Sequence, residues 1–149
     1  MREQFSEGLK TALKARDQRR TATLRAITAA IKDKDIAIRT ENRGPATNEE
    51  ILSIIQKMVK QREESFAIYA QAGRADLATV EKEEIDILNE FLPKALTDAE
   101  VEAAIQAAIA TTGAEGAKDM GKVIAQLKSE YPGRIDFGKA SGKVKAALS

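Results

Sequence analysis

Residues 47–73 read TNEEILSIIQKMVKQREESFAIYAQAG, and this stretch indicates the fold class. Its apolar side chains recur every three or four residues, which is the period of one face of an α-helix. They are Ile51, Ile54, Ile55, Met58, Val59, Phe66 and Tyr69. Thr47 and Glu50 have the spacing of a capping box, and Gly73 suits the position just after a helix end. The stretch therefore predicts one helix of about 24 residues, or roughly 36 Å.

Shorter helices are predicted on both sides of this one. The apolar positions expected to face the core are Phe5, Leu9 and Leu13 in a first helix, and Leu24, Ile27, Ile31 and Ile38 in a second. A further stripe over residues 77–91 ends at Pro93, which cannot continue a helix. No strand-like alternation and no internal repeat is present. The pattern predicts an all-α protein.

The segment around Pro93 is the natural domain boundary. Residues 1–93 are predicted to form an elongated N-terminal helical bundle, and residues 94–149 a small C-terminal domain of three short, alanine-rich helices. A second capping box at residues 97–100 begins the smaller domain. Phe137 lies in the turn over residues 133–138 and is expected to pack into this smaller domain.

The residue inventory excludes several kinds of chemistry. The chain has no cysteine and no histidine, so a thiolate or imidazole zinc site, a Cys–His dyad and a Ser–His–Asp triad are impossible. No glycine-rich phosphate loop is present. We therefore predict no catalytic residue, no metal site and no cofactor. No apolar run reaches about 18 residues and the N-terminus has no apolar core, so we expect a cytoplasmic protein with no membrane contact.

Charge is balanced overall but uneven along the chain. The protein has 24 Lys and Arg against 23 Asp and Glu, which argues against indiscriminate polyanion binding but permits a local basic patch. The basic stretch near the N-terminus contains Lys10, Lys14, Arg16, Arg19, Arg20 and Arg25. It would contact RNA phosphates or form a solvated helix face.

An acidic run over residues 81–90 follows in the middle of the chain. Two carboxylates at helical spacing can serve acid–base chemistry, but we expect these to pair with the basic first helices or to face water. Arg62 lies on the apolar stripe of the long helix, so it needs a partner for its charge. We expect Arg62 and Arg74 to be partners of this acidic run.

Residues 118–136, KDMGKVIAQLKSEYPGRID, contain a glycine near a helix start. Glycine inside a helix costs about 1 kcal/mol relative to alanine, so either a neighbouring helix packs on Gly121 or a ligand approaches its backbone. We expect Asp119 to cap the helix and Gly121 to be a packing residue. Lys118 and Lys122 would then form part of an anion-facing surface, with Arg134 as a bidentate contact.

Several dispersed motifs resemble those of the GatB/YqeY family. In chain order they are KARD at residues 14–17, LR at 24–25, IQKMVKQREES at 55–65, AGR at 72–74, FLP at 91–93 and DMGKV at 119–123. The resemblance covers nearly the whole chain. It implies an all-helical protein with an N-terminal helical domain and a C-terminal three-helix domain.

The resemblance also carries expectations about function. The family is related to the tail of the B subunit of tRNA-dependent amidotransferase, and that tail grips the body of the tRNA. Free-standing members inherit a carbon–nitrogen ligase assignment with glutamine as amido donor, but the residues here offer no constellation for autonomous catalysis. We therefore expect a module that binds structured RNA, with tRNA as the partner. The nucleic-acid-binding candidates are Lys118, Gly121, Lys122, Arg134, Arg16, Arg20 and Arg25. The alternative is a protein–protein adaptor or auxiliary factor of an amidotransferase-like assembly.

Overall fold

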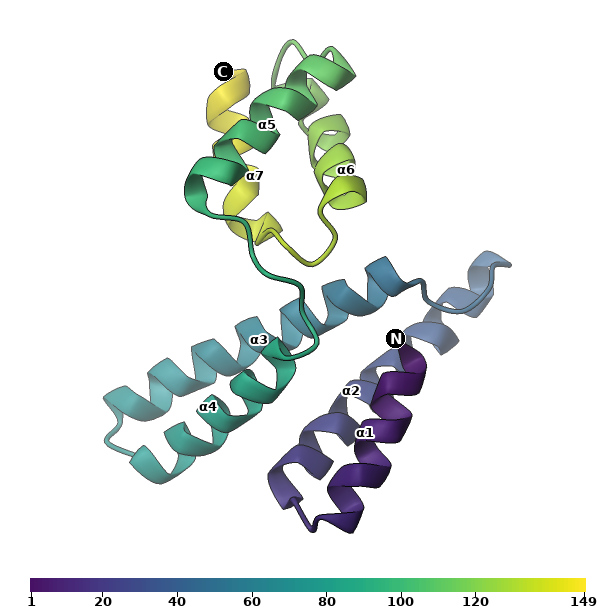
Figure 1. Ribbon diagram of the computed structural model, residues 1–149. Coiled ribbons are helices and arrows are strands. Elements are labelled where there is room, and N and C mark those ends of the chain that lie inside the picture. Colours follow the sequence, from purple (N-terminus) through teal and green to yellow (C-terminus); the bar gives the residue numbers. More distant parts are fainter. The chain divides into compact units, whose positions relative to one another are not determined.

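The computed structural model of the chain describes residues 1–149 and contains seven α-helices, two 3₁₀ turns and no strand (Figure 1). The predicted all-α class is confirmed. By their contacts the residues divide into two compact units, Met1–Leu92 and Pro93–Ser149. Each unit has a hydrophobic core of its own, so the two are described separately. None of the helices combines the length and the apolar character that a membrane span requires.

The first unit consists of two antiparallel helical hairpins (Figure 1). Its helices are α1 (Arg2–Lys14), α2 (Gln18–Ile38), α3 (Asn48–Gln71) and α4 (Ala75–Asn89). The long helix predicted from the sequence is α3, with 24 residues. Both halves of its capping box form: the Glu50 N–H donates to the Thr47 hydroxyl (3.2 Å), and the Glu50 carboxylate accepts from the Thr47 N–H (3.1 Å). Local sequence therefore determines where α3 begins.

The core of the first unit joins all four helices around the first half of α3. Ile51 and Ile55 are completely buried against Leu24 of α2 and Leu88 of α4. Phe5 of α1 is buried in the same cluster and lies 5.0 Å, centroid to centroid, from the Phe91 ring. Each of these fully buried aliphatic side chains contributes about 1.5–3 kcal/mol.

Two predictions about this core are wrong. Leu13 is 49% exposed, and Ala12 is the buried residue at that end of α1. Phe5 and Ala12 lie two turns apart on the side of α1 that faces the core, whereas Leu13 is turned about 100° away from Ala12. On α3, burial stops at Val59, and Phe66 is 37% exposed. The apolar stripe of α3 therefore extends beyond the part of the helix that is buried by the rest of the unit.

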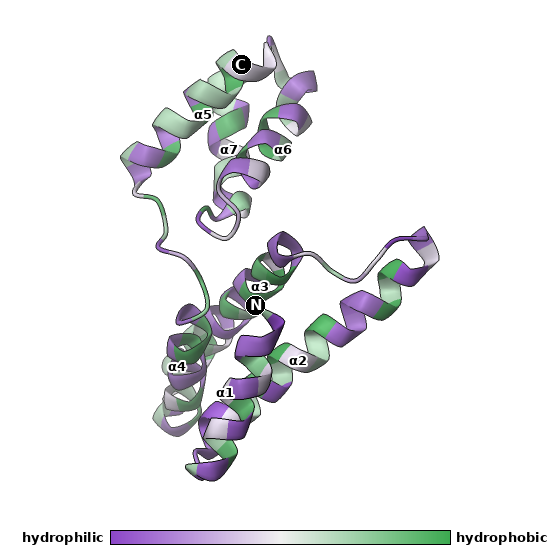
Figure 2. Ribbon diagram, turned by 45° about the vertical axis from the view of Figure 1, so that its right-hand side comes forward, coloured by the Kyte–Doolittle hydropathy of each residue, from purple (hydrophilic) through white to green (hydrophobic).

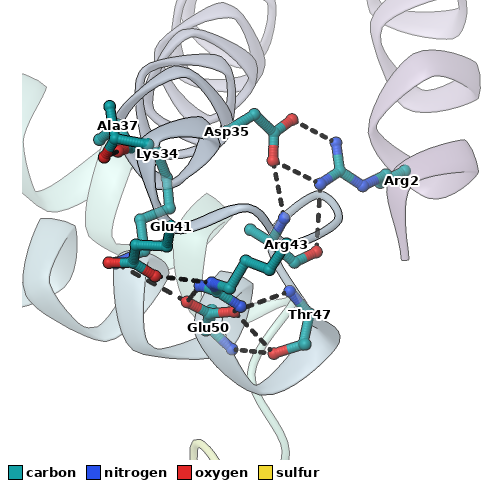
Figure 3. Close-up of polar contacts among 10 residues, drawn as sticks. Arg2, Lys34, Asp35, Ala37, Glu41, Arg43, Thr47 and Glu50 are labelled. Carbon is teal, nitrogen blue, oxygen red and sulfur yellow. Dashed lines mark hydrogen bonds and ion pairs between the residues drawn. The ribbon is translucent and has the colours of Figure 1, made fainter.

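A polar network closes the connection between α2 and α3, which includes the 3₁₀ turn η1 (Arg39–Glu41) (Figure 3). The Arg2 guanidinium donates two hydrogen bonds of 2.9 Å to Asp35 and one of 3.1 Å to the Ala46 carbonyl. Asp35 also accepts the Ala46 N–H at 2.8 Å. The Arg2 hydrogen bonds, followed by the Ala46 N–H, lower the pKa of Asp35 to about 2. This network ties α1 to the loop that leads into α3.

A second ionic contact lies beside it (Figure 3). Arg43 donates to both carboxylate oxygens of Glu50 and to Glu41. The hydrogen bonds from Arg43, followed by the Thr47 N–H, lower the pKa of Glu50 to about 2. Glu50 therefore serves the capping box and the loop at the same time.

The second unit contains α5 (Asp98–Thr112), η2 (Ala117–Asp119), α6 (Met120–Glu130) and α7 (Phe137–Leu148). Figure 2 shows hydrophobic colour along most of α5, which is rich in alanine. Val123, Leu127 and Val144 are completely buried between the three helices. Phe137 is partly buried against this core, as predicted, and the Lys128 ammonium lies 5.6 Å from its ring centroid.

In the two hairpins of the first unit, the first helix ends with the same hydrogen-bond pattern, although the residues at the key position differ. After α1, the N–H groups of Arg16 and Asp17 bond back to Leu13 and Ala12, and after α3 those of Gly73 and Arg74 bond back to Ala70 and Tyr69. This is the Schellman pattern, whose key residue adopts the left-handed conformation. Gly73 has φ +73°, and Arg16 has φ +58°. Glycine takes this conformation freely, whereas arginine is strained in it.

We expect Arg16→Gly to raise the free energy of unfolding by about 0.5–1 kcal/mol, because the strain relieved exceeds the entropy gained by the unfolded chain. Urea unfolding followed by circular dichroism measures the change. The matched control is Gly73→Ala, which should lower the free energy of unfolding by about 1 kcal/mol. A loss of stability in Arg16→Gly would contradict the strain argument.

We expect the Asp35→Asn variant to be less stable than wild type at neutral pH, because Arg2 loses its charged partner. A carboxyl with a lowered pKa stabilises the folded state above its ordinary pKa of 3.8, and this contribution is lost as the pH falls toward 2. The stability deficit of the variant should therefore shrink between about pH 5 and pH 2. Urea unfolding across this range tests it, with Asp33→Asn as the control, because Asp33 forms no ion pair. A deficit that is constant with pH would contradict it.

Candidate nucleic-acid interface

The start of α6 differs from the predicted anion site. The 3₁₀ turn Ala117–Asp119 leads directly into α6, and the Met120 N–H donates to the Ala117 carbonyl. Asp119 stands at the N-cap position of α6, but its side chain makes no cap hydrogen bond. Its carboxylate instead accepts the Glu115 N–H at 3.1 Å, and this hydrogen bond is the main cause of its lowered pKa. The prediction that the Asp119 side chain caps this helix is therefore wrong, and the Met120 N–H at the helix start is bonded to the preceding turn.

Gly121 is exposed in the first turn of α6. A Cβ atom built on it would meet no atom within 4 Å, so no neighbouring helix packs on this glycine. The prediction of a packing role is wrong, because the side of α6 that faces the core is carried by Val123 and Leu127. Packing by a neighbouring helix therefore does not explain this glycine.

Lys118 and Lys122 flank Gly121 in sequence, and both side chains are exposed. The Lys122 ammonium lies 3.6 Å from the Asp119 carboxylate, although the lysine is 69% exposed. Such an exposed pair contributes little, about 0–1 kcal/mol. Lys118 forms no ion pair. Both lysines are accessible to a phosphate group.

Arg134 has a structural role that the sequence did not indicate. Its Nε donates to the Lys94 carbonyl at 2.9 Å, and its own carbonyl accepts the Leu96 N–H at 2.9 Å. These two bonds hold the segment that leads into α5. The terminal nitrogens of the guanidinium form no hydrogen bond within the chain. Lys122 lies in the first turn of α6 and Arg134 follows its last residue, so the backbones of the two are separated by a helix about 16 Å long.

The arginine candidates of the first unit separate into paired and unpaired residues. Arg20 makes two hydrogen bonds to Glu90, at 2.8 and 2.9 Å, and they raise its pKa. Arg16 and Arg25 are exposed and form no ion pair. Arg20 is therefore committed to joining α2 to α4, whereas the other two are available.

The acidic run pairs with the basic helices, as expected. Arg19 of α2 donates to Glu83 at 3.0 Å, and Arg62 of α3 donates to Glu84 at 2.8 Å with both side chains largely buried. Arg74 does not join this run and pairs with Asp76 instead. The run serves the packing of the first unit.

Four further cations of the second unit were missed by the sequence reasoning. Only Lys122 and Lys143 of this unit form ion pairs with carboxylates, to Asp119 and Asp98. The cations that form no ion pair are Lys94, Lys118, Lys128, Arg134, Lys139 and Lys145. The Lys118 charge still helps to lower the pKa of Asp119, after the Glu115 N–H hydrogen bond, and the charges of Arg134 and Lys94 help to lower that of Glu100, after the Thr97 hydrogen bonds. The sequence gives the number of lysines and arginines in this unit. Which of them form no ion pair depends on how the helices pack. No three acidic side chains come together in a group that could hold a metal ion.

A family model described as Yqey-like protein matches residues 2–148. The chain belongs to this family. The GatB/YqeY resemblance drawn from the dispersed motifs is therefore confirmed.

Curated relatives share the name "Altered inheritance of mitochondria protein 41, mitochondrial". The chain is similar to the Kluyveromyces lactis protein, with 31% identity over 147 residues, covering 96% of this chain and 73% of the relative. It is also similar to the Clavispora lusitaniae protein, with 33% identity over 84 residues, covering 56% of this chain and 46% of the relative. The match to the Saccharomyces cerevisiae protein covers 49% of that relative. In several relatives, the matched part is thus about half of the length.

These relatives correct one expectation. The sequence alone predicted a cytoplasmic location, and the relatives are named as mitochondrial proteins. The cytoplasmic prediction is wrong by this comparison. It rested on the absence of an apolar segment, which a mitochondrial targeting segment does not need, because such segments are amphipathic.

We expect Gly121→Ala to raise the free energy of unfolding by up to about 1 kcal/mol, because the added methyl group meets open space and alanine favours the helix. Urea unfolding measures this gain. Gly142→Ala in α7 is the matched control, since Gly142 is also helical, exposed and free of contacts. A loss of stability in Gly121→Ala alone would show that this glycine has a structural role after all.

Proposed function

We propose that the protein binds structured RNA, with tRNA as the foremost candidate, through the cations of its second unit. The observation that carries the proposal is the set of exposed lysines there that form no ion pair, with Lys118 three residues before Gly121, whose backbone no neighbouring side chain covers. Unpaired lysines bind phosphates without first losing an intramolecular ion pair. The resemblance to the tRNA-gripping tail of the amidotransferase supports the same assignment.

The chemistry of these residues favours recognition by shape and phosphate position. Most of the unpaired cations are lysines, which act as point charges on flexible stems. The second unit contains no tryptophan, and its aromatic residues Tyr131 and Phe137 are partly buried against the core, so stacking of unpaired bases has no platform. Contacts of this kind position a protein on an RNA fold without reading its bases.

The test is the binding of a purified tRNA to the full chain across a salt series, measured by fluorescence anisotropy. The Lys118→Glu, Lys122→Glu double variant should bind more weakly and flatten the dependence of log K on log salt by about 1 for each lost phosphate contact. The control is Lys57→Glu with Lys60→Glu, which makes the same charge change at two exposed lysines of α3.

Absence of binding at about 50 mM salt would remove the proposal. Equal losses of tRNA affinity in the test and control variants would show that binding is general electrostatic attraction and not a contact of the second unit. A defined protein partner that survives nuclease treatment, in a chain that does not bind tRNA, would favour the adaptor function instead.

A further inference from the structure

The far end of the α3–α4 hairpin is not covered by the rest of the first unit. No residue of α3 beyond Val59 is buried, and Ala78 is the only buried residue among the first ten of α4. The ion pair between Arg19 and Glu83 joins α2 to α4. In the second half of α3, the apolar side chains of Phe66 and Ile68 are exposed, by 37% and 64%.

A groove of about 440 Å³ runs between the two helices at this end. Its lining includes the apolar residues Phe66 and Ala70 from α3 and Ala75 and Ala78 from α4, together with Gly73, Thr79, Lys82 and Glu83. Small residues at these positions let another side chain approach the two backbones closely. The groove therefore has the form of a site for an apolar side chain on a helix.

The charges around the groove favour a basic occupant. Lys82 and Glu83 line the groove and are each paired, with Asp86 and with Arg19, and Arg62 is paired with Glu84. Glu63, one turn before Phe66 on the same helix, is exposed and has no cation partner. A cationic side chain next to an apolar one would complement this surface.

The last turn of α1 has this composition. Leu13 is 49% exposed and is followed by Lys14, which forms no ion pair. Lys10, one turn before Leu13, is bound only to the exposed Glu7, at 3.4 Å. An apolar side chain between two lysines matches a groove lined by Phe66, with the exposed Glu63 one turn before Phe66 on α3.

We propose that the α3–α4 groove of one molecule receives the end of α1 from a second copy of this chain. Leu13 enters the groove against Phe66 and Ala70, and Lys14 faces Glu63. Because each copy has both surfaces, the exchange can be reciprocal. The contact is small, so association in the micromolar to millimolar range is expected. This inference does not depend on RNA binding.

Sedimentation velocity across that concentration range should show a reversible increase in mass that weakens with salt. Ala70→Arg fills the groove with a cation and should abolish the increase. Ala67→Arg is the matched control, because Ala67 is exposed on the same helix but does not line the groove. Leu13→Glu should also abolish it, whereas Ile36→Glu, at an equally exposed position of α2 (48%), should not. Circular dichroism checks that each variant is folded.

A mixture of the Leu13→Glu and Ala70→Arg variants gives the decisive result. The first variant retains an intact groove and the second an intact α1, so the mixture should associate although neither variant does alone. A wild-type chain that stays monomeric at millimolar concentration would overturn the proposal. So would equal effects of Ala67→Arg and Ala70→Arg, or a mixture that does not associate.

Discussion

The first half of α3 is the constraint on which the first unit depends. Ile51 and Ile55 belong to one buried cluster with residues of α1, α2 and α4. Burial of each side chain contributes about 1.5–3 kcal/mol to the stability of the fold. The hydrogen bonds of Asp35 and Glu50 fix where this helix begins and bring α1 to the same place. In the second half of α3 no residue is buried. One end of the unit is therefore a closed core, and the other end presents an apolar surface to solvent.

Ion pairing decides which cations of this protein are available to a ligand. Arg20 and Arg25 lie on the same helix and are both basic, but Arg20 is bound to Glu90 through two hydrogen bonds and Arg25 has no partner. A phosphate that binds Arg20 would have to displace a carboxylate that also joins two helices. The overall charge near zero is thus compatible with a local basic surface, because acids and bases are not evenly matched in space.

The second unit separates structural from accessible polar groups. Arg134 and Asp119 both looked like ligand or cap residues, and both are engaged in holding loops through backbone groups. The lysines remain exposed on helix surfaces, where a long stem keeps the charge in water. The chain belongs to the YqeY-like family, whose model matches residues 2–148. In several curated relatives, the part that matches this chain is about half of the relative's length.

The sequence by itself determined the helices, the two capping boxes and the all-α class. The capping boxes at Thr47 and Thr97 and the turn at Gly73 depend on hydrogen bonds between residues close in the chain, so local spacing was sufficient. The dispersed motifs were sufficient for the family. Only the tertiary structure decided that Leu13 and Phe66 are exposed, that nothing packs on Gly121 and that Arg20 is paired. Each of these depends on which helix surfaces meet, and the free energy of such contacts comes from residues far apart in sequence, which periodicity along one helix cannot identify.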